Sequence, residues 1–308
     1  MQTGRFSFLA RESEELRQEG FTYKTTYQYT VFWDGERLDC RKNQRLLTRD
    51  PRNPDPNAPL AWRFQTLMEG VRTFWHAEAE GSVGDTSVAM TAKDRLMQCR
   101  GSLGDVGQGI EGYCPLDYGK AVWEILGERD SRIQVRPKRE VVNDHPTWVI
   151  DASTRHGQYT LWLDPNLGCL PRRFFNRKRS DDLMLGDKTM DELSAMPSPG
   201  GKVESRPIPK EIVYDLHSVE IEKIGERFVI VGGVAEKTTK LSNGQENHSK
   251  VTYNRTKVDL TPDFSLTPDA FTLLVPNGTK AYDIDDGSIT YEWREGKLCP
   301  RIESRSER

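Results

Sequence analysis

YTLWLDPNLGCLPRRF, residues Tyr159–Phe174, is the stretch of sequence that decides the expected fold. It reads as a strand, a tight turn over Asp164–Gly168, and a second strand that runs into a group of basic residues. Similar strand–turn–strand units recur along almost the whole chain. The sequence therefore predicts an α+β fold that is mainly antiparallel β, built around one large curved sheet.

The longest predicted strand is Phe21–Trp33, where apolar or aromatic residues occupy nearly every odd position. This period of two indicates one buried and one solvated face. At about 3.3 Å per residue the strand would be roughly 43 Å long, far longer than the usual strand of about 5–6 residues. Asp34-Gly35 then favours a hairpin turn that returns the chain through Glu36–Arg41.

The same reading predicts further strands along the rest of the chain. They are Ala61–Met68, Val71–Glu80, Thr86–Thr91, Arg95–Arg100, Arg132–Val142, Thr147–Ser153, Gln158–Leu163, Cys169–Arg177, Ile208–Ile221, Arg227–Thr239, Asn247–Asp259 and Ser288–Arg294. One helix is expected over Pro115–Leu126, because proline stands in its first turn and Gly127 just past its end.

The expected organisation is a polar segment at residues 1–20, a single β domain at residues 21–300 and a charged tail at residues 301–308. A proline-rich loop at residues 196–209 would lie on the surface of that one domain.

The net charge of −3 gives no reason to expect nucleic acid as a partner. No run of about 18 apolar residues predicts a transmembrane span, and Met1–Gly20 is too polar for a signal peptide.

Motifs for catalysis and for cofactors are weak. Residues 107–112 match G-x-G-x-x-G, but the βαβ setting that a dinucleotide site needs is missing. The five histidines lack metal-ligand spacing, and the five cysteines include no C-x-x-C pair. We therefore expect no enzyme, no metal and no cofactor. A hydrolase would need Asp, His and Ser side chains to gather in a cleft.

A basic run follows the turn and predicts a patch on the surface. Its members are Arg172, Arg173, Arg177, Lys178 and Arg179. Such a patch can contact anionic headgroups or a nucleic-acid backbone. It can also guard the edge of a sheet against aggregation, which is the interpretation that we favour.

The run YTLWLDPNLGCLPRRF, after VVNDHPTWVIDAS, resembles the Y-x-x-W-L-D-P-x-x-G-Y-L-P-x-R pattern of envelope proteins related to the lipoprotein carrier LolA. The later run DAFTLLVPNGTKAYD is also similar to large LolA-like proteins. The resemblance covers roughly residues 21–293, with Cys169 where an aromatic residue is more usual. It implies a LolA-like lipoprotein-sorting fold, an unclosed half-barrel with helices packed on its concave face.

The resemblance also implies a non-enzymatic role in the cell envelope, in which a lipid or lipoprotein acyl chains lie between sheet and helix. Export would require a leader that has been removed, and a cytoplasmic protein is the alternative. In an oxidising compartment Cys99 and Cys114 would be candidates for a disulfide, subject to their geometry.

Candidate cavity residues come from the apolar strand positions and from the expected helix, although the sequence does not decide which strand face is inside. They are Phe64, Leu67, Phe74, Trp123, Leu126, Trp148, Ile150, Leu161 and Leu163. The alternative is a structural or interaction module without a ligand, which would dock a protein partner through a sheet edge or through the basic run at residues 172–179.

Overall fold

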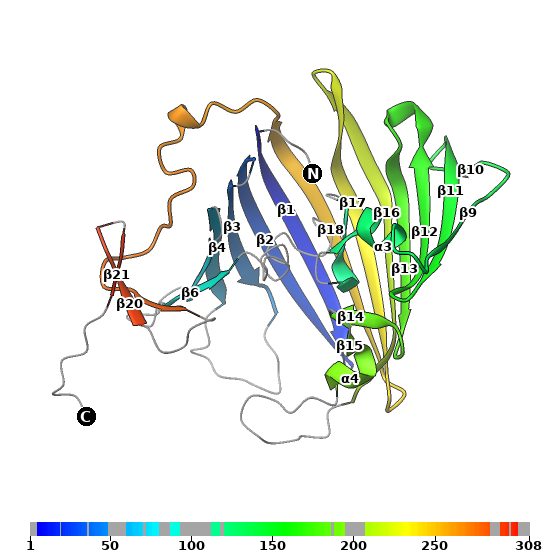
Figure 1. Ribbon diagram of the computed structural model, residues 1–308, viewed down its shortest axis with the longest axis horizontal. Helices are drawn as coiled ribbons and strands as arrows, with labels where there is room; N and C mark the ends of the chain where they lie inside the picture. Colours follow the sequence, from blue (N-terminus) through cyan, green and yellow to red (C-terminus); the bar gives the residue numbers. More distant parts are fainter. Residues whose placement is uncertain are drawn as a thin grey trace.

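A computed structural model gives the fold of the chain (Figure 1). It describes residues 5–18, 20–35, 37–48, 60–69, 72–79, 87–92, 112–117, 120–185, 188–194, 207–283, 290–295 and 297–300. Within these ranges the protein is mostly antiparallel β structure, built around one sheet of 17 strands. The predicted fold class is confirmed at this level: one large, unclosed, mainly antiparallel sheet.

The pairings give the spatial order of the strands from one edge to the other. It runs β21 (Lys297–Pro300), β20 (Thr290–Arg294), β19 (Lys280–Asp283), β6 (Ser87–Ala92), β5 (Arg72–Ala79), β4 (Ala61–Glu69), β3 (Arg37–Leu46), β2 (Phe21–Asp34), β1 (Arg5–Gln18), β18 (Glu246–Asp259), β17 (Arg227–Leu241), β16 (Pro209–Ile224), β13 (Leu170–Arg179), β12 (Gly157–Asp164) and β11 (His145–Thr154), with β9 (Arg132–Val135) and β10 (Glu140–Val142) both on the outer edge of β11. Of the described pairs in this sheet, β6–β19 alone is parallel.

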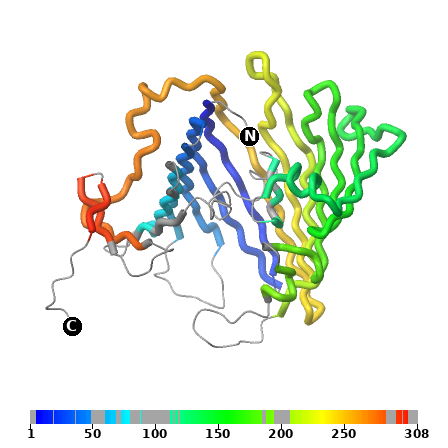
Figure 2. Tube along the Cα trace, viewed as in Figure 1, coloured from blue at the N-terminus to red at the C-terminus, as the bar shows by residue number. Residues whose placement is uncertain are grey.

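The chain starts in the middle of this sheet. It moves outward from β1 through β6, reappears at the opposite edge as β9, and works back to β18, which pairs with β1 (Figures 1 and 2). Residues 260–279 then lead back to β19 beside β6. The ladder between β1 and β18 therefore joins two halves that are far apart in sequence.

The central position of β1 corrects the expectation of a polar segment before the sheet. Arg5–Gln18 pairs along its whole length with β2 and over most of its length with β18. The sequence hides this strand because its second half turns acidic side chains inward. Glu14, for example, accepts hydrogen bonds from Tyr27 Oη at 2.8 Å and from Ser249 Oγ at 3.1 Å. A charged residue that points inward and is hydrogen-bonded interrupts the apolar alternation in the sequence, but the strand still forms.

Most of the other strand predictions are confirmed within a few residues. Arg132–Val142 is an exception, because it forms two strands, β9 and β10, separated by a bend. The predicted strand Arg95–Arg100 and the tail at residues 301–308 lie outside the described residues, as does most of the proline-rich loop. The turn at Asp164 forms as expected: its side chain accepts a bond from Asn166 N at 2.9 Å, and Gly168 takes a left-handed φ of 67°.

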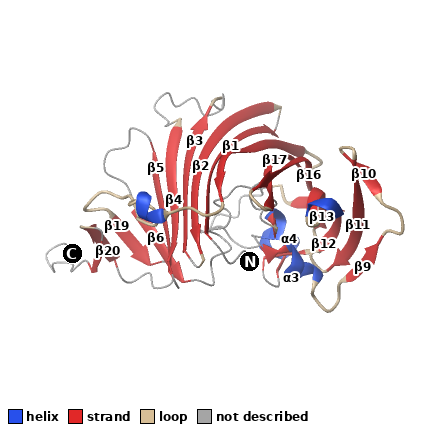
Figure 3. Cartoon of the chain, turned by 90° about the horizontal axis from the view of Figure 1, so that it is seen from above, coloured by secondary structure: helices blue, strands red, loops and turns tan. Residues whose placement is uncertain are grey.

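The expected helix over Pro115–Leu126 is wrong in extent. This segment forms a 3-10 turn η3 (Pro115–Asp117), a short strand β8 (Lys120–Ala121) that pairs with β7 (Tyr113–Cys114), and a single α-helical turn α3 (Val122–Leu126). The only other described α-helix is α4 (Met190–Ser194), which follows the small ribbon β14 (Leu183–Leu185) and β15 (Lys188–Thr189) (Figure 3). Two further 3-10 turns are η4 (Pro165–Leu167) and η5 (Phe264–Leu266).

Two apolar clusters hold the described structure together. The larger one joins both halves of the sheet, from Phe8 and Val31 through Tyr214 and Phe174, and includes Ile125 of α3. The smaller one lies on the opposite face of β4–β6 and β19. Its members are Leu67, Val88, Leu273 and Ala281, with Phe74, Phe271, Val275, Tyr291, Trp293 and Leu298 packed against them.

Polar side chains fix the segment that covers the smaller cluster. Gln65 donates to Thr272 O at 2.8 Å and accepts from Leu274 N at 2.8 Å, while Asp39 accepts from Phe271 N at 3.1 Å. Both Gln65 and Asp39 are buried. These bonds satisfy the backbone of a segment that has no strand partner, so it can lie across the sheet at a defined register.

The sheet divides where β17 and β18 separate. Their ladder ends at Gly232↔Asn254, yet β17 continues beside β16 as far as Arg227↔Ile224, and β18 continues beside β1 as far as Ser7↔Asp259. Two glycines mark the point of separation. A Cβ on Gly233 would lie 3.2 Å from Leu216 Cδ1, and one on Gly232 would lie 3.3 Å from Tyr253 O. The absence of a side chain therefore lets β17 bend tightly against its neighbours.

Replacing Gly233 should destabilise the protein at this bend. Gly233→Val would force a branched side chain against Leu216, which is fully buried, and overpacking of this kind costs about 1–3 kcal/mol. Urea unfolding should show a lower midpoint, whereas Thr239→Val, farther along the same strand, should change it little. Equal midpoints for wild type and Gly233→Val would show that the position has room.

Candidate functional site

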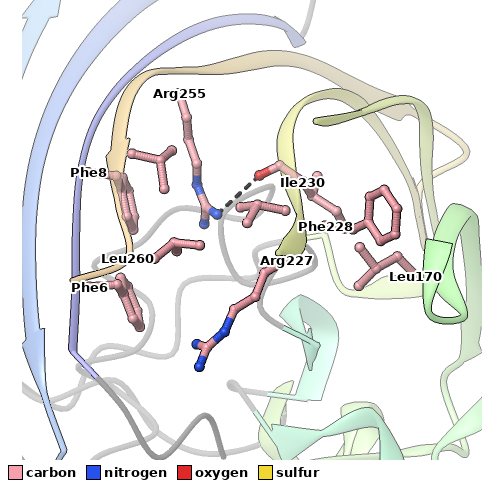
Figure 4. A pocket seen from close by; sticks show the side chains of 10 residues that line it. Phe6, Phe8, Leu170, Arg227, Phe228, Ile230, Arg255 and Leu260 are labelled. Atoms are coloured by element: carbon pink, nitrogen blue, oxygen red, sulfur yellow. Dashed lines mark hydrogen bonds between the residues drawn. The ribbon is translucent and has the colours of Figure 1, made fainter. Parts of the chain in front are cut away.

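The separation of β17 and β18 opens a cavity that we call the slot (Figure 4). Its volume is about 70 Å³. Apolar side chains and two arginines line it: Phe6, Phe8, Leu170, Arg227, Phe228, Val229, Ile230, Arg255, Val258 and Leu260. No acidic residue is among these described lining residues. Drug-sized ligands occupy about 300–1,000 Å³, so the slot matches one end of a ligand rather than a whole one.

Arg255 forms the inner part of the slot. Its side chain is held against the Phe8 ring, with Cζ 4.2 Å from the ring centroid. Nη1 donates to Ile230 O at 3.1 Å, and Nε donates to Tyr253 Oη at 3.3 Å. The bond to Ile230 spans the gap between the separated strands, where a ladder bond would otherwise lie. The residue is only 9% exposed, so a fixed positive charge sits in surroundings of low polarity.

Arg227 stands at the other end of the slot, beside the tip of the β16–β17 hairpin. Its side chain is exposed and points away from Phe228 and from Arg255 (Figure 4). Among the described residues it has no hydrogen bond and no ion pair. The carboxylate of the adjacent Glu226 lies 3.6 Å from Lys223 Nζ and pairs with that lysine rather than with Arg227. Arg227 thus presents a guanidinium whose donors are available to a bound molecule.

A second polar group lies deep in the other half of the protein, and we call it the latch. It consists of Asp117, Lys178, His156, Tyr159 and Glu128. Asp117 Oδ1 lies 2.6 Å from Lys178 Nζ and 3.0 Å from His156 Nδ1, and Asp117 Oδ2 accepts from Tyr159 Oη at 2.9 Å. Lys178 Nζ also donates to His156 O and Leu183 O. Every donor on the ammonium is therefore used.

Glu128 connects the latch to the surface. Its carboxylate lies 3.1 Å from His156 Nε2, 2.5 Å from Lys120 Nζ and 2.8 Å from Arg155 Nε. Burial acts to raise the pKa of Glu128, but the hydrogen bonds from Arg155 and Lys120 and the charge of His156 lower it to about 2. Burial likewise acts to raise the pKa of Asp117, and His156 and Lys178 hold it below its usual value.

The latch contains the residue types that acid–base catalysis uses, but these side chains are buried from solvent. Asp117, His156 and Lys178 are each no more than 3% exposed, whereas a general acid or base has to approach its substrate within hydrogen-bond distance. The described residues also include no group of three or more His, Cys, Asp or Glu side chains placed as metal ligands. The geometry therefore assigns the latch to stability: it holds residues 112–128 against β12 and β13.

The predicted cavity residues fall into separate groups, and none of them lines the slot. Leu67 and Phe74 face each other across β4 and β5 in the smaller cluster, on the face opposite Phe64. Phe64 stacks on Trp75 with ring centroids 6.3 Å apart. Leu126 and Leu161 pack against the larger cluster. The separation of Leu67 from Phe64 on β4 follows from strand geometry, because successive side chains of a strand point to opposite faces of the sheet.

The remaining predicted cavity residues lie toward the β9–β11 edge. Ile150 pairs with Leu161, and Trp148 pairs with Leu163. Trp148 is 37% exposed beneath Arg139, and Trp123 of α3 is 51% exposed. Both tryptophans keep apolar surface in contact with solvent, as residues of a binding face do.

The predicted basic patch does not form as one surface. Strand β13 lies between β12 and β16 and is not an edge, so the patch does not guard one. Alternation buries Arg172 and Lys178, where they pair with Asp164 and Asp117. The other members point to the opposite face. There Arg173 binds Asp215, Arg177 binds Glu211, and Arg179 is exposed.

The sequence analysis missed the slot, although two signals could have located it. The run Arg227–Gly233 has an apolar core followed by two adjacent glycines, and such a pair within a strand marks a bend or a close approach. Arg255 also interrupts the inward positions of β18 after Val251 and Tyr253. The considered disulfide has one partner, Cys99, outside the described residues, and Cys114 is a buried free thiol.

No protein-family model and no curated protein sequence matches the chain. Among solved structures it is similar to a DUF1329 family protein from Desulfovibrio piger, with 10% identity, coverage of 88% of this chain and 90% of that one, and a TM-score of 0.37. A porin-like protein from Bacteroides uniformis gives 9% identity, coverage of 80% and 96%, and a TM-score of 0.23. These likenesses assign the chain to no family and do not show the LolA relationship.

None of the described helices has the length and apolar character of a membrane span. The two α-helices within the described ranges contain five residues each.

Removing the carboxylate of Asp117 should lower the free energy of unfolding far more than removing the ammonium of Lys178. Asp117→Ala leaves the ammonium of Lys178 buried without its carboxylate, and breaking a buried pair in this way costs about 3–5 kcal/mol. Lys178→Met replaces the charge with an apolar side chain of similar length and leaves Asp117 bonded to His156 and Tyr159, so its loss should be smaller. Chemical denaturation measures both, and equal losses would contradict the assigned roles.

The latch should also weaken in acid. The pKa of Glu128 is lowered from its ordinary 4.5 to about 2. A lowered pKa stabilises the fold fully above the unfolded-state value, and this contribution is lost as pH falls toward the folded-state value. The difference in unfolding free energy between wild type and Glu128→Gln should therefore be constant above about pH 5 and shrink between about pH 4.5 and pH 2. A difference that does not change with pH would refute this.

Proposed function

We propose that this protein is a non-enzymatic binding protein of the cell envelope, located in the periplasm, that holds a lipid, an acylated protein or another hydrophobic ligand. The slot is the observation that carries the proposal. It arises where two strands of a continuous sheet separate, and eight of its ten described lining residues are apolar. A space formed in this way is part of the backbone arrangement and does not depend on one small side chain.

The size of the slot limits which part of the ligand it can hold. At about 70 Å³ it takes one end, and the rest has to lie along exposed apolar surface. Phe228 at the slot is 38% exposed. Covering such side chains supplies affinity at about 25 cal/mol per Å² of apolar surface removed from water. In a LolA-like arrangement, residues 112–128 with Trp123 and Leu126 would lie over the concave face and help to enclose the ligand.

A second candidate function is a structural or interaction module that docks a protein partner. It is favoured by one observation at the sheet edge, where Ile133 and Val135 of β9 are 51% and 54% exposed. An edge strand with exposed apolar residues can pair with a strand from another protein. This candidate predicts a partner and no extractable ligand. The basic run at residues 172–179 does not support this candidate, because its side chains lie on both faces of β13 and do not form one surface.

The proposal is tested by what the purified protein carries and takes up. Extraction with organic solvent followed by mass spectrometry should find a hydrophobic molecule in near-stoichiometric amount, and a fluorescent acyl probe should bind the extracted protein. If no lipid is extracted and no probe binds, the protein is not a carrier of this kind.

The slot itself is tested by Phe228→Glu. A carboxylate at this position should weaken binding of the acyl probe by about tenfold or more, because the contact surface becomes charged and hydrated. Leu266→Glu is the matched control, since Leu266 is 80% exposed and does not line the slot. Probe titration followed by fluorescence measures both. Equal affinities for the two variants would move the binding site elsewhere.

A further inference from the structure

We infer that the outer edge of β9 binds a second protein by accepting an extended segment that alternates apolar and acidic residues. This inference rests on the second candidate function and names the chemistry of the partner. It depends on three features of the described residues: main-chain groups that point away from the sheet, apolar side chains on one face, and cations without ion pairs around the strand.

The main chain of β9 has one paired side and one open side. Among the described strands β9 pairs with β11 alone, and all four of its residues are exposed at the border of the sheet (Figure 3). Just past the strand, Arg136 N donates to Val149 O at 2.9 Å, so the main chain of Arg136 points toward β11. Alternate residues of an antiparallel strand point their main-chain groups to the same side, so those of Gln134 also face β11. The N–H and C=O groups of Ile133 and Val135 therefore point away from the sheet and can pair with an added strand.

The apolar side chains of β9 extend the face of the sheet that carries the larger apolar cluster. Val135 pairs with Ile150, which pairs in turn with Leu161 of β12, and paired residues of antiparallel strands share a face. Leu161 packs against that cluster, whereas Val135 and Ile133, on the same face, are 54% and 51% exposed. An added strand would place its own side chains about 4.5–5.5 Å from these two residues and remove their surface from water. The face therefore favours an apolar residue at every second position of the partner.

The charges around β9 favour acidic residues at the other positions of the partner. Residues 129–139 contain five cations and a single acid, Asp130. One of the cations, Arg136, is held by Asp151 and Glu140. The other four are exposed and form no ion pair with the described residues: Arg129, Arg132, Lys138 and Arg139. Arg132 lies on the face opposite the two apolar side chains, so an acidic side chain on that face of an added strand would lie beside it.

The same charges argue against a second copy of this chain as the partner. Antiparallel pairing of β9 with its own copy, centred on Gln134, would place Arg132 of each copy opposite Arg136 of the other. Like charges directly opposite each other destabilise a strand pair. An acidic strand would meet the same main-chain and apolar groups with attraction instead of repulsion.

The test measures the affinity of the full chain for fluorescein-labelled peptides of about eight residues, made of Val-Glu, Val-Gln, Val-Lys or Ser-Glu repeats. Fluorescence anisotropy reports each affinity. The Val-Glu peptide should bind about tenfold or more tightly than the Val-Lys and Ser-Glu peptides, with Val-Gln between them. Methylating the amide nitrogens of its valines should abolish binding, because the valines lie opposite the open main-chain groups of Ile133 and Val135. Methylating the amides of its glutamates should not.

Two variants locate the site. Val135→Pro removes an N–H that points away from β11, so it should weaken binding of the Val-Glu peptide about fivefold or more and change thermal unfolding little. Arg132→Glu should reverse the preference in favour of the Val-Lys peptide, and it leaves no buried charge because Arg132 is exposed. Lys257→Gln is the matched control, since Lys257 is an exposed cation on β18, which does not neighbour β9 in the sheet.

The outcomes separate this inference from the function on which it rests. Equal binding of the Val-Glu, Val-Gln and Val-Lys peptides, all lost in Val135→Pro, would refute the acidic partner and keep docking at the β9 edge. Binding of no peptide, or binding that Val135→Pro leaves unchanged, would refute both. A dimer in sedimentation velocity that Val135→Pro converts to a monomer would overturn the inference in favour of a second copy. Binding to phosphatidylglycerol vesicles that Arg132→Glu abolishes, without binding of any peptide, would assign the same side chains to a lipid surface.

Discussion

The ladder between β1 and β18 is the interaction on which the rest of the structure depends. It pairs residues more than two hundred positions apart in sequence, for example Glu14 with Val251, and among the described strand pairs it alone joins the outward half of the sheet, β1–β6, to the returning half, β9–β18. The larger apolar cluster crosses this ladder through Phe8, Ala10 and Tyr253. Because these contacts are so distant in sequence, forming them closes a long loop and costs chain entropy, which the packing of the cluster has to offset.

The slot is a direct consequence of this connection. β18 has to follow β1 to its end, and β17 has to follow β16, so the two strands separate once the bend at Gly232 and Gly233 turns them apart. Arg255 then occupies the space that a continued ladder would have closed, and its bond to Ile230 O keeps the two sides in register. The charge of Arg255 is therefore part of how the sheet is built.

Much of the sheet could be predicted from the sequence, because strand alternation is a local property. Phe21–Asp34 and Gly157–Arg179 show an apolar period of two and strong turn residues, and both form as expected. β1 could not be found in this way, since Glu12 and Glu14 occupy inward positions, and Glu14 is satisfied there by Tyr27 of the next strand together with Ser249 of β18. A local pattern cannot show which polar residues will be satisfied by a strand more than two hundred residues away.

The same limit explains the errors about the site and the basic run. Whether an arginine is a surface charge or half of a buried pair depends on what lies opposite. Arg172 and Lys178 meet Asp164 and Asp117, and of these only Asp164 is a neighbour in sequence. The sequence predicts too long a helix before Gly127 because its residues are apolar on several sides, whereas only Val122–Leu126 forms α3, with Ile125 buried in the larger apolar cluster. A sequence reveals amphipathic strands well but not the pairing of isolated charges.

The slot and the latch show two uses of buried charge in one sheet. In the latch every donor of Lys178 meets an oxygen within 2.7 Å, so the ammonium is fully satisfied and has no capacity for a ligand. At the slot the guanidinium of Arg255 is anchored to Ile230 O, and the side chain of Arg227 is exposed. Desolvating a charge is expensive unless an opposite charge meets it. A satisfied pair therefore holds an element in place, whereas a side chain such as Arg227, which forms no ion pair with the described residues, stays exposed to solvent.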